Sequence, residues 1–281
     1  MILSTDSTAN LPKEYYEELN INMIPMQINL NNEIYDDLDK RLPIEDYYQK
    51  MREGAVPTTA QINEFSAREY LSRLIETGED VLHIGFSSAL SGSTATMKRV
   101  AEELNATHKN KIVVIDSLNA SVGEGLLVLK AHDLMKEGKN IDEVAKEIED
   151  LIPYACSYFT VDQLKYLVRG GRLSKVSGML GTLLNIKPVL RVDETGHLVA
   201  YKKVISRRKA LSEIVKICKE KIADTKYVYI AHAVASEDAR RVAEMLKQEI
   251  GVEPIITDLT QVIGCHTGPG LIALFFFGKE K

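Results

Sequence analysis

The sequence predicts an α/β protein with two domains, residues 1–154 and 155–281, on two observations. In the first half, short apolar runs rich in β-branched residues, such as VLHIGFS and KIVVIDS, alternate with amphipathic stretches. This alternation is typical of βαβ units, so we expect a largely parallel, Rossmann-like sheet with flanking helices. In the second half, KPVLRVD and HLVAYKKV flank the turn residues ETG, which predicts a hairpin within a mixed or antiparallel sheet with helices.

The elements of the first half are expected in alternating order. MILSTD predicts a buried strand, followed by a helix that Asn10 caps, and INMIPMQINL is extended. DYYQKMREG and EFSAREYLSRLIETG are helical, the first ending at Gly54 and the second turning Phe65 and Leu71 inward. After VLHIGFS a helix begins at about Ser93, and after KIVVIDS another begins near GEGLLVLKAHDLM.

The second half opens with a strong helical stripe in IDEVAKEIEDLI, followed by the strand-like YACSYFTV. DQLKYLVRGGRLS predicts a helix that ends at the Gly-Gly pair, and SGMLGTLLN continues helically. After the hairpin come an amphipathic helix at KALSEIVKICKEKI, a strand at KYVYIAHA and a helix capped by Ser236. VEPIITDL and LIALFFFG are the last expected strands.

The composition excludes several classes of protein. The 281 residues carry a formal net charge of −5, and the densest basic run is Arg207–Lys209, so no nucleic-acid partner is expected. The three cysteines are scattered without a CxxC motif, which indicates a reducing cytoplasm. The N-terminus lacks the basic region of a signal peptide. The longest charge-free apolar stretch, 176–186, is too short to span a bilayer, so no stable membrane insertion is expected.

Four polar segments are expected at the carboxyl ends of strands, where open α/β sheets bind ligands. They are Asp6–Thr8, Pro57–Gln61, Ser87–Ser93 and the GCHTGPG segment, 264–270. The Ser87–Ser93 loop offers hydroxyls and backbone N–H groups beside a helix N-terminus, a combination that binds anions, although Ser91 or Ser93 could equally be a plain helix cap. Neither GxxxxGK[ST] nor GxGxxG occurs, so no nucleotide cofactor is expected.

Cys265 and His266 are adjacent in the GCHTGPG segment, but neighbouring side chains of extended chain point apart, so adjacency does not make a catalytic couple. Cys265 is expected to be a packing residue. The spacings typical of zinc ligands are absent, so no metal is expected. If Thr59 and Ser91 converge on His266, the two hydroxyls and one imidazole N–H could hold a carboxylate. Otherwise His266 is structural.

Several segments together resemble the DegV family, in order and spacing, along nearly the whole chain. They are STDSTANLP, PTTAQ, SSALSGS, VIDSLNASVGEG, YLVRGGRLSKVSGMLGTLLNIKPVL and HTGPG. The resemblance implies a two-domain α/β fold. The family's best-understood members are the fatty-acid-binding subunits of bacterial fatty acid kinase. They hold a long-chain fatty acid and present its carboxylate to a separate ATP-dependent kinase subunit, which forms an acyl phosphate.

Carried over by position, the resemblance assigns the carboxylate ligands to Thr59, Ser91 and His266. Family members often have serine where this chain has Ala60, which removes one hydroxyl. Further residues next to these ligands are possible members of the site: Thr58, Gly92, Ser93 and Thr267. The resemblance implies a lipid-binding subunit without a catalytic nucleotide site of its own.

The resemblance also implies an apolar tunnel between the domains for the acyl chain. Candidate tunnel residues, each of which could equally be ordinary core, are Met179, Leu180, Leu183, Leu184, Ile186 and Phe275 to Phe277. Arg172 and Arg207 are candidates for docking the kinase, although Arg172 could also be structural.

An enzyme remains the alternative. The fold resembles the substrate domain of dihydroxyacetone kinase, in which a histidine binds a small ketone covalently. By that analogy His266 could be a nucleophile, or Cys265 could carry out acyl transfer. A covalent adduct would favour the enzyme, and a long apolar tunnel would favour the carrier.

Overall fold

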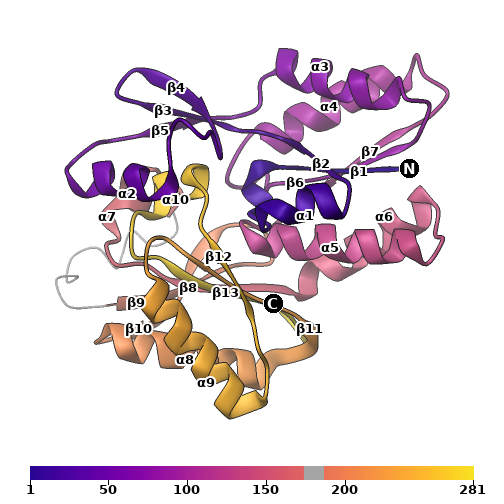
Figure 1. The fold of residues 1–281 in the computed structure, drawn as a ribbon. Helices are drawn as coiled ribbons and strands as arrows, with labels where there is room; N and C mark the ends of the chain where they lie inside the picture. Colours follow the sequence, from indigo (N-terminus) through magenta and orange to yellow (C-terminus); the bar gives the residue numbers. More distant parts are fainter. Residues whose placement is uncertain (174–186) are drawn as a thin grey trace.

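The computed structural model describes residues 1–173 and 187–281 and stacks helices and sheets in layers (Figure 1). The upper sheet is four-stranded and entirely parallel, in the order β2-β1-β6-β7. Its strands are β1 (Ile2–Asp6), β2 (Ile21–Ile24), β6 (Val81–Gly85) and β7 (Ile112–Asp116). Helices α3 (Glu64–Ile75) and α4 (Ser93–Asn105) cover its outer face. The predicted parallel sheet is confirmed.

The lower sheet has six strands in the order β10-β9-β8-β13-β11-β12. All neighbours are antiparallel except β11 and β12, which confirms the predicted mixed sheet and its hairpin. The strands are β8 (Ala155–Thr160), β9 (Lys187–Val192), β10 (Leu198–Val204), β11 (Ile222–His232), β12 (Ile255–Asp258) and β13 (Ile272–Gly278). Helices α8 (Arg207–Lys221) and α9 (Ser236–Ile250) pack on its outer face (Figure 1).

Helix α5 (Val122–Lys136) lies between the two sheets and contacts strands of both. Its residues from Val122 to Leu129 are all buried, as expected for a helix segment packed between two sheets, and Glu124 is the charged residue among them. Helices α1 (Lys13–Glu18) and α6 (Ile141–Leu151) lie in the same middle layer (Figure 1). One apolar core therefore runs through residues of both halves, and the division at residues 154 and 155 stays a prediction.

A small third sheet, in the order β4-β3-β5, closes one end of the molecule (Figure 1). Its strands are β3 (Gln27–Leu30), β4 (Glu33–Asp36) and β5 (Thr58–Ala60). Helices α2 (Ile44–Arg52), α7 (Lys165–Arg169) and α10 (Gln261–Thr267) lie beside it, and α10 contacts β3 and β5. Two short 3-10 turns, η1 (Ser7–Ala9) and η2 (Ile152–Tyr154), complete the described elements.

Three local predictions were wrong. Asn10 does not cap α1. It adopts a left-handed conformation, and its side chain donates to the carbonyl of Asp258 and accepts from the N–H of Thr260. Phe65 is 77% exposed, because the buried residues of α3 lie on the opposite face of that helix. Ser236 is the first helical residue of α9 and not its cap.

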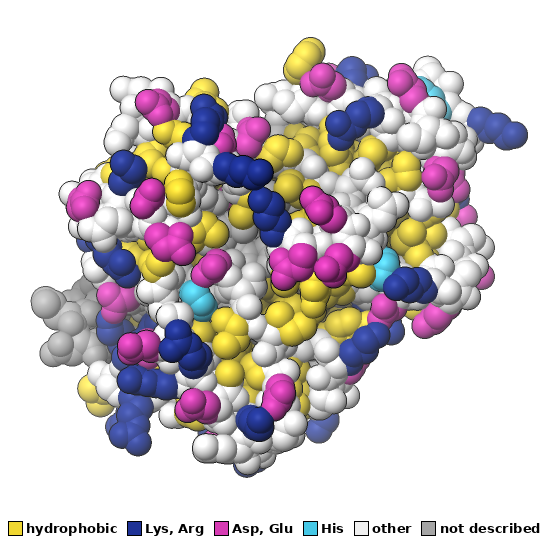
Figure 2. Space-filling view, viewed as in Figure 1, with side chains coloured by type: hydrophobic (Ala, Val, Ile, Leu, Met, Phe, Trp, Pro, Cys, Tyr) yellow, Lys and Arg dark blue, Asp and Glu magenta, His cyan; other side chains and the backbone are white. Residues whose placement is uncertain are grey.

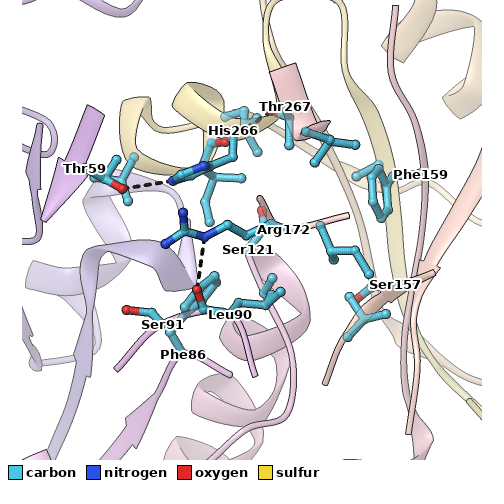
Figure 3. Close-up of a pocket in the computed structure, with 18 of the residues that line it drawn as sticks. Thr59, Phe86, Leu90, Ser91, Ser121, Ser157, Phe159, Arg172, His266 and Thr267 are labelled. Atoms are coloured by element: carbon cyan, nitrogen blue, oxygen red, sulfur yellow. Dashed lines mark hydrogen bonds between the residues drawn. The ribbon is translucent and has the colours of Figure 1, made fainter. Parts of the chain in front are cut away.

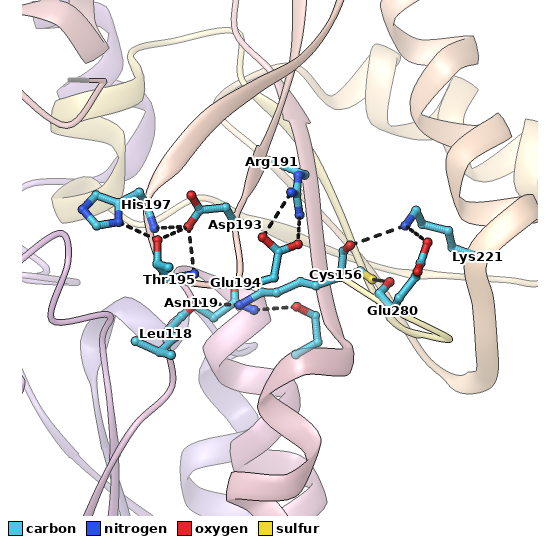
Figure 4. Close-up of polar contacts among 12 residues, drawn as sticks. Leu118, Asn119, Cys156, Arg191, Asp193, Glu194, Thr195, His197, Lys221 and Glu280 are labelled. Carbon is cyan, nitrogen blue, oxygen red and sulfur yellow. Dashed lines mark hydrogen bonds and ion pairs between the residues drawn. The ribbon is translucent and has the colours of Figure 1, made fainter. Parts of the chain in front are cut away.

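The hairpin between β9 and β10 packs on the loops at the carboxyl edge of the parallel sheet. The Ser87 hydroxyl donates to the carbonyl of Gly196 over 2.9 Å. Gly196 has a φ of +79°, and a Cβ there would clash with Ser87. In the same region, buried Lys281 donates to the carbonyl of Leu118 over 2.7 Å, and burial lowers the pKa of its amine to about 8 (Figure 4). These contacts fix the loop that leads into α5.

On the face shown in Figure 2, acidic and basic side chains are interspersed and small apolar areas lie between them. In the described part of the chain, helices long and apolar enough to cross a bilayer are absent. The helix expected at SGMLGTLLN lies outside the described residues, as do the tunnel candidates Met179, Leu180, Leu183, Leu184 and Ile186.

Candidate ligand-binding site

A cavity of about 310 Å³ lies where the carboxyl ends of the parallel strands face the six-stranded sheet. Loops that follow β2, β6 and β7 form one side, β8 and β13 form another, and α10 closes the end. Its wall is mainly apolar and includes Phe86, Leu90, Phe159, Val192, Leu271 and Phe275. This is the position at which open α/β sheets bind ligands, and the volume is at the lower end of the range of small-molecule sites, roughly 300–1,000 Å³.

The three residues expected to bind a carboxylate all line this cavity (Figure 3). Thr59 comes from β5, Ser91 from the loop before α4, and His266 from the last turn of α10. The Thr59 hydroxyl and His266 Nε2 are 2.9 Å apart and share a hydrogen bond. The Ser91 hydroxyl is 3.0 Å from that of Ser93. Residues far apart in sequence therefore place three potential donors in one cavity.

The four possible additional residues divide into two groups. Gly92 and Thr267 line the cavity, whereas Thr58 is exposed and Ser93 is buried, and neither lies among the residues of its wall. A Cβ at Gly92 would meet only the end of the flexible side chain of Gln61, which is exposed. The Ser93 hydroxyl accepts from the N–H of Ile62, a structural contact.

His266 lies in a helix, so the extended conformation expected for Cys265 and His266 was wrong. The carboxylate of Asp37 accepts from the N–H groups of Gln261 and Val262, at 3.0 and 3.2 Å, and so caps the start of α10. Negative charge at a helix N-terminus is stabilising. Gly268 has a φ of +75° and ends the helix, as glycine commonly does. The cap is distant in sequence, so local residue types do not reveal it.

The imidazole of His266 is uncharged at neutral pH. Burial, together with the smaller effect of the guanidinium groups of Arg172 and Arg169, lowers its pKa from 6.5 to about 4. Nδ1 has no hydrogen-bond partner in the described part of the chain, and a Cβ on Gly170 would clash with it. A neutral ring donates one N–H, as expected from the sequence.

Arg172 lines the cavity beside these donors. The sequence left open whether it docks the kinase or is structural, and the docking role stays a prediction. Its Nε donates to the carbonyl of Leu90 over 3.3 Å and its Nη1 to the carbonyl of Gly170 over 2.6 Å. Figure 3 shows its side chain between His266 and Ser91. The polar end of the cavity therefore holds a permanent positive charge. The resemblance of this segment to the RGGRLS segments of a known family was the sequence signal for Arg172. No local sequence pattern predicts where its side chain lies.

Arg207 lies away from the cavity and is held within the chain. Its Nε donates to the carboxylate of Asp238 over 2.9 Å, and its Nη2 donates to the carbonyl of Gly270 over 2.6 Å. These contacts join the start of α8 to α9 and to the turn after α10. A docking role for Arg207 stays a prediction.

Cys265 is a packing residue, as predicted. It is 4% exposed, its thiol donates to the carbonyl of Pro57, and burial raises its pKa to about 11. It is not among the described residues of the cavity wall. Cys156 and Cys218 are buried as well. A thiol that stays protonated near pH 7 is a poor nucleophile, which disfavours acyl transfer at this position.

The phenylalanines of β13 point alternately to its two faces. Phe275 lines the cavity, whereas Phe276 stacks on Tyr158 in the outer core and Phe277 meets Tyr227 edge-on. Alternation along the strand turns Phe276 to the opposite face. Phe277 shares the face of Phe275 but is not among the described residues of the wall, so Phe275 alone of the three fits the predicted tunnel. No group of three or more His, Cys, Asp or Glu residues positioned to hold a metal ion occurs at 1–173 or 187–281.

Fold and site define a two-sheet α/β protein with an apolar cavity that ends in hydrogen-bond donors and a guanidinium. The family model described as "Uncharacterised protein, DegV family" matches residues 2–279. A DegV domain-containing protein of Clostridium perfringens is 38% identical over 285 residues, covering 100% of this chain and 98% of the relative. The chain belongs to the DegV family.

Solved structures agree with this assignment. A DegV family protein of Thermus thermophilus, described by its fatty acid binding, is 29% identical with a TM-score of 0.87, and 99% of each chain is covered. DegV of Bacillus subtilis, described as a fatty acid binding protein, is also 29% identical, with a TM-score of 0.86 and 99% of each chain covered.

Proposed function

We propose that this chain binds a long-chain fatty acid, with the alkyl chain in the cavity and the carboxylate at Thr59, Ser91 and His266. The observation that carries the proposal is one cavity with an apolar wall and a polar, cationic end. The descriptions of the Thermus and Bacillus relatives support it. The mainly apolar wall also favours a carrier over an enzyme that binds a small ketone.

Both ends of the ligand have a physical reason to bind. Burial of the alkyl chain contributes about 0.8 kcal/mol per CH₂ group. The carboxylate would lose water and so needs compensation, which Arg172 can supply as a cation and the two hydroxyls as donors. On binding, the Thr59–His266 hydrogen bond would be exchanged for bonds to the ligand.

The direct test is to identify lipid in the purified protein. Mass spectrometry of the denatured chain is expected to release a fatty acid, and delipidated protein is expected to take up oleate. A chain that contains no lipid and takes up none would contradict the proposal.

We further infer that the chain presents its fatty acid to a separate ATP-dependent fatty acid kinase. The compartment would then be the cytoplasm, where ATP is available. The loaded protein, ATP and a candidate kinase should form an acyl phosphate that hydroxylamine traps. Failure with every fatty acid kinase of the source organism would contradict the partnership while leaving fatty-acid binding intact.

The predicted docking role of Arg207 is tested in the same assay. Arg207→Glu is expected to lower kinase turnover, and Lys216→Glu, an exposed cation farther along α8, serves as the control. Because Arg207 also pairs with Asp238, the melting temperature and fatty-acid affinity of each variant must be measured alongside. Unchanged turnover with Arg207→Glu would remove it from the docking surface.

A further inference from the structure

The cavity wall contains two serines besides Ser91. Ser121 precedes α5 and is 4% exposed, and Ser157 lies in β8 and is 2% exposed. Figure 3 shows Ser157 across the cavity from Thr59 and Ser91. Phe275, directly opposite Ser157 in the sheet, is another residue of the wall. An unsubstituted alkyl chain gives these hydroxyls nothing to bond.

The Ser121 hydroxyl is available as a donor. It is buried and has no hydrogen-bond partner within 1–173 and 187–281. It occupies the N-cap position of α5 without capping the helix through its side chain. A buried hydroxyl without a partner is unfavourable, so an oxygen of a ligand at this position would be stabilising. The partial positive charge of the helix N-terminus favours the same oxygen.

The Ser157 hydroxyl is available as an acceptor. It donates to Asn119 Oδ1 over 2.7 Å, and the Asn119 amide group donates to the carbonyl of Ala155, which fixes this direction. The Ser157 oxygen therefore keeps free lone pairs and has no further proton to give. The Ser157 hydroxyl packs against the first turn of α5, because a Cβ on Gly123 of that turn would clash with it.

The two serines together are complementary to an alcohol. A ligand hydroxyl can accept where it lies beside Ser121 and donate where it lies beside Ser157, whereas a ketone can only accept. A second carboxylate on the ligand would need a cation beside it. Among the described residues of the wall the charged side chain is Arg172, which lies at the other polar site. A neutral hydroxyl fits this part of the cavity best.

We propose that Ser121 and Ser157 select fatty acids that carry a hydroxyl group partway along the acyl chain. The proposal rests on fatty-acid binding as the function of the cavity and names the class of acyl chain. A site built to bind a hydroxyl discriminates against the analogue that lacks it, because its own polar groups are then left unpaired.

The test compares octadecanoic acid with hydroxy-octadecanoic acids that carry the hydroxyl at successive positions. Dissociation constants are measured on delipidated full-length chain by calorimetry. At least one positional isomer is expected to bind about 5- to 10-fold more tightly than the parent acid, as one additional hydrogen bond allows. No advantage for any isomer would overturn the proposal.

Ser121→Gly is the decisive variant. Ser121 has a φ of 55°, a conformation that glycine adopts without strain, so the variant removes the hydroxyl and preserves the local backbone. The ratio of the two dissociation constants should fall to about 1 in Ser121→Gly and toward 1 in Ser157→Ala. Ser212→Ala, an exposed serine on α8, should keep the wild-type ratio.

The outcomes separate this proposal from the proposed function. A ratio that persists in Ser121→Gly would assign the preference to other residues and overturn the role of the serines. Binding of octadecanoic acid without any preference would refute only the selectivity. If neither acid binds, fatty-acid binding itself fails.

Discussion

At the scale of single residues, the polar end of the cavity combines a fixed charge with neutral donors. Arg172 supplies the positive charge, and burial, with a smaller contribution from this charge, lowers the pKa of His266 and keeps its ring uncharged. Under the proposed function, this arrangement would bind a carboxylate by one cation and several hydrogen bonds without requiring a proton from solution. Two predictions follow from these side chains.

The first concerns the ionisation of His266. In the ligand-free chain its ring resonances should not titrate between pH 8 and 5.5, because burial lowers its pKa to about 4. Its contribution to stability is full above pH 6.5 and is lost as the pH falls from 6.5 toward 4. NMR titration checks this, with His266→Gln used to assign the ring resonances of His266. A titration midpoint near pH 6.5 would contradict the prediction. In Arg172→Met the pKa should rise, because one of the charges that lower it is gone.

The second compares neighbouring threonines. Thr59→Val removes a donor at the proposed carboxylate site and should weaken fatty-acid binding by about 1.5–3 kcal/mol, roughly 10- to 150-fold. Ser91→Ala should have a loss of the same order. Thr58→Val is the matched control, since Thr58 is exposed and outside the cavity wall. Equal affinities for the two threonine variants would refute the assignment of Thr59.

At the scale of elements, α10 carries His266 and depends on contacts from distant segments. Asp37 caps it, Asn10 bonds the N–H of Thr260, and the amide of Gln261 donates to the carbonyl of Leu42. The position of His266 is thus set by the first sixth of the chain.

Removal of the Asp37 cap should therefore affect both stability and binding. Asp37→Ala is expected to lower the free energy of unfolding by about 1–2 kcal/mol and to weaken fatty-acid binding through His266. Asp37→Asn, which keeps an acceptor oxygen, should lose less. Denaturant unfolding and calorimetry measure the two effects, with exposed Asp36→Ala as the control. Full affinity in Asp37→Ala would show that α10 holds its position without the cap.

The contribution of Asp37 to stability changes with pH in the opposite direction to that of His266. Burial raises the pKa of Asp37 from 3.8 to about 6, more than its hydrogen bonds lower it. The folded chain therefore binds this proton more tightly than the unfolded chain does. Its contribution to stability increases as the pH falls from 6 toward 3.8, and Asp37→Asn should abolish that component of the pH profile.

At the scale of the whole molecule, α5 joins the two sheets into one packed unit. Its buried side chains touch both, and its N-terminus forms part of the cavity wall. Loss of packing in α5 should therefore lower the stability of the whole described fold.

Leu126→Ala tests this coupling. Leu126 is fully buried, and its truncation should cost about 2–5 kcal/mol of stability. Circular dichroism and tyrosine fluorescence should report one transition, shifted equally. Val56→Ala, at a residue that is 56% exposed, should change stability by less than about 0.5 kcal/mol. Separate transitions for the two probes would show that the halves unfold independently.

The sequence alone predicted the parallel and mixed sheets and most helices, because the period of apolar residues is a local property. It also indicated Thr59, Ser91 and His266, through residue types at strand ends and through the resemblance to a family. It misjudged Asn10 and Phe65, whose environments depend on what packs against them.

Tertiary structure alone decided the rest. It placed Arg172 in the cavity, made a helix of the segment around His266, and left Ser121 and Ser157 in an apolar wall. A cavity is the space that remains when sheets and helices pack. Its lining comes from segments that can be 207 residues apart or more, as Thr59 and His266 are. Local patterns cannot encode that space, because its shape depends on long-range contacts of the whole chain.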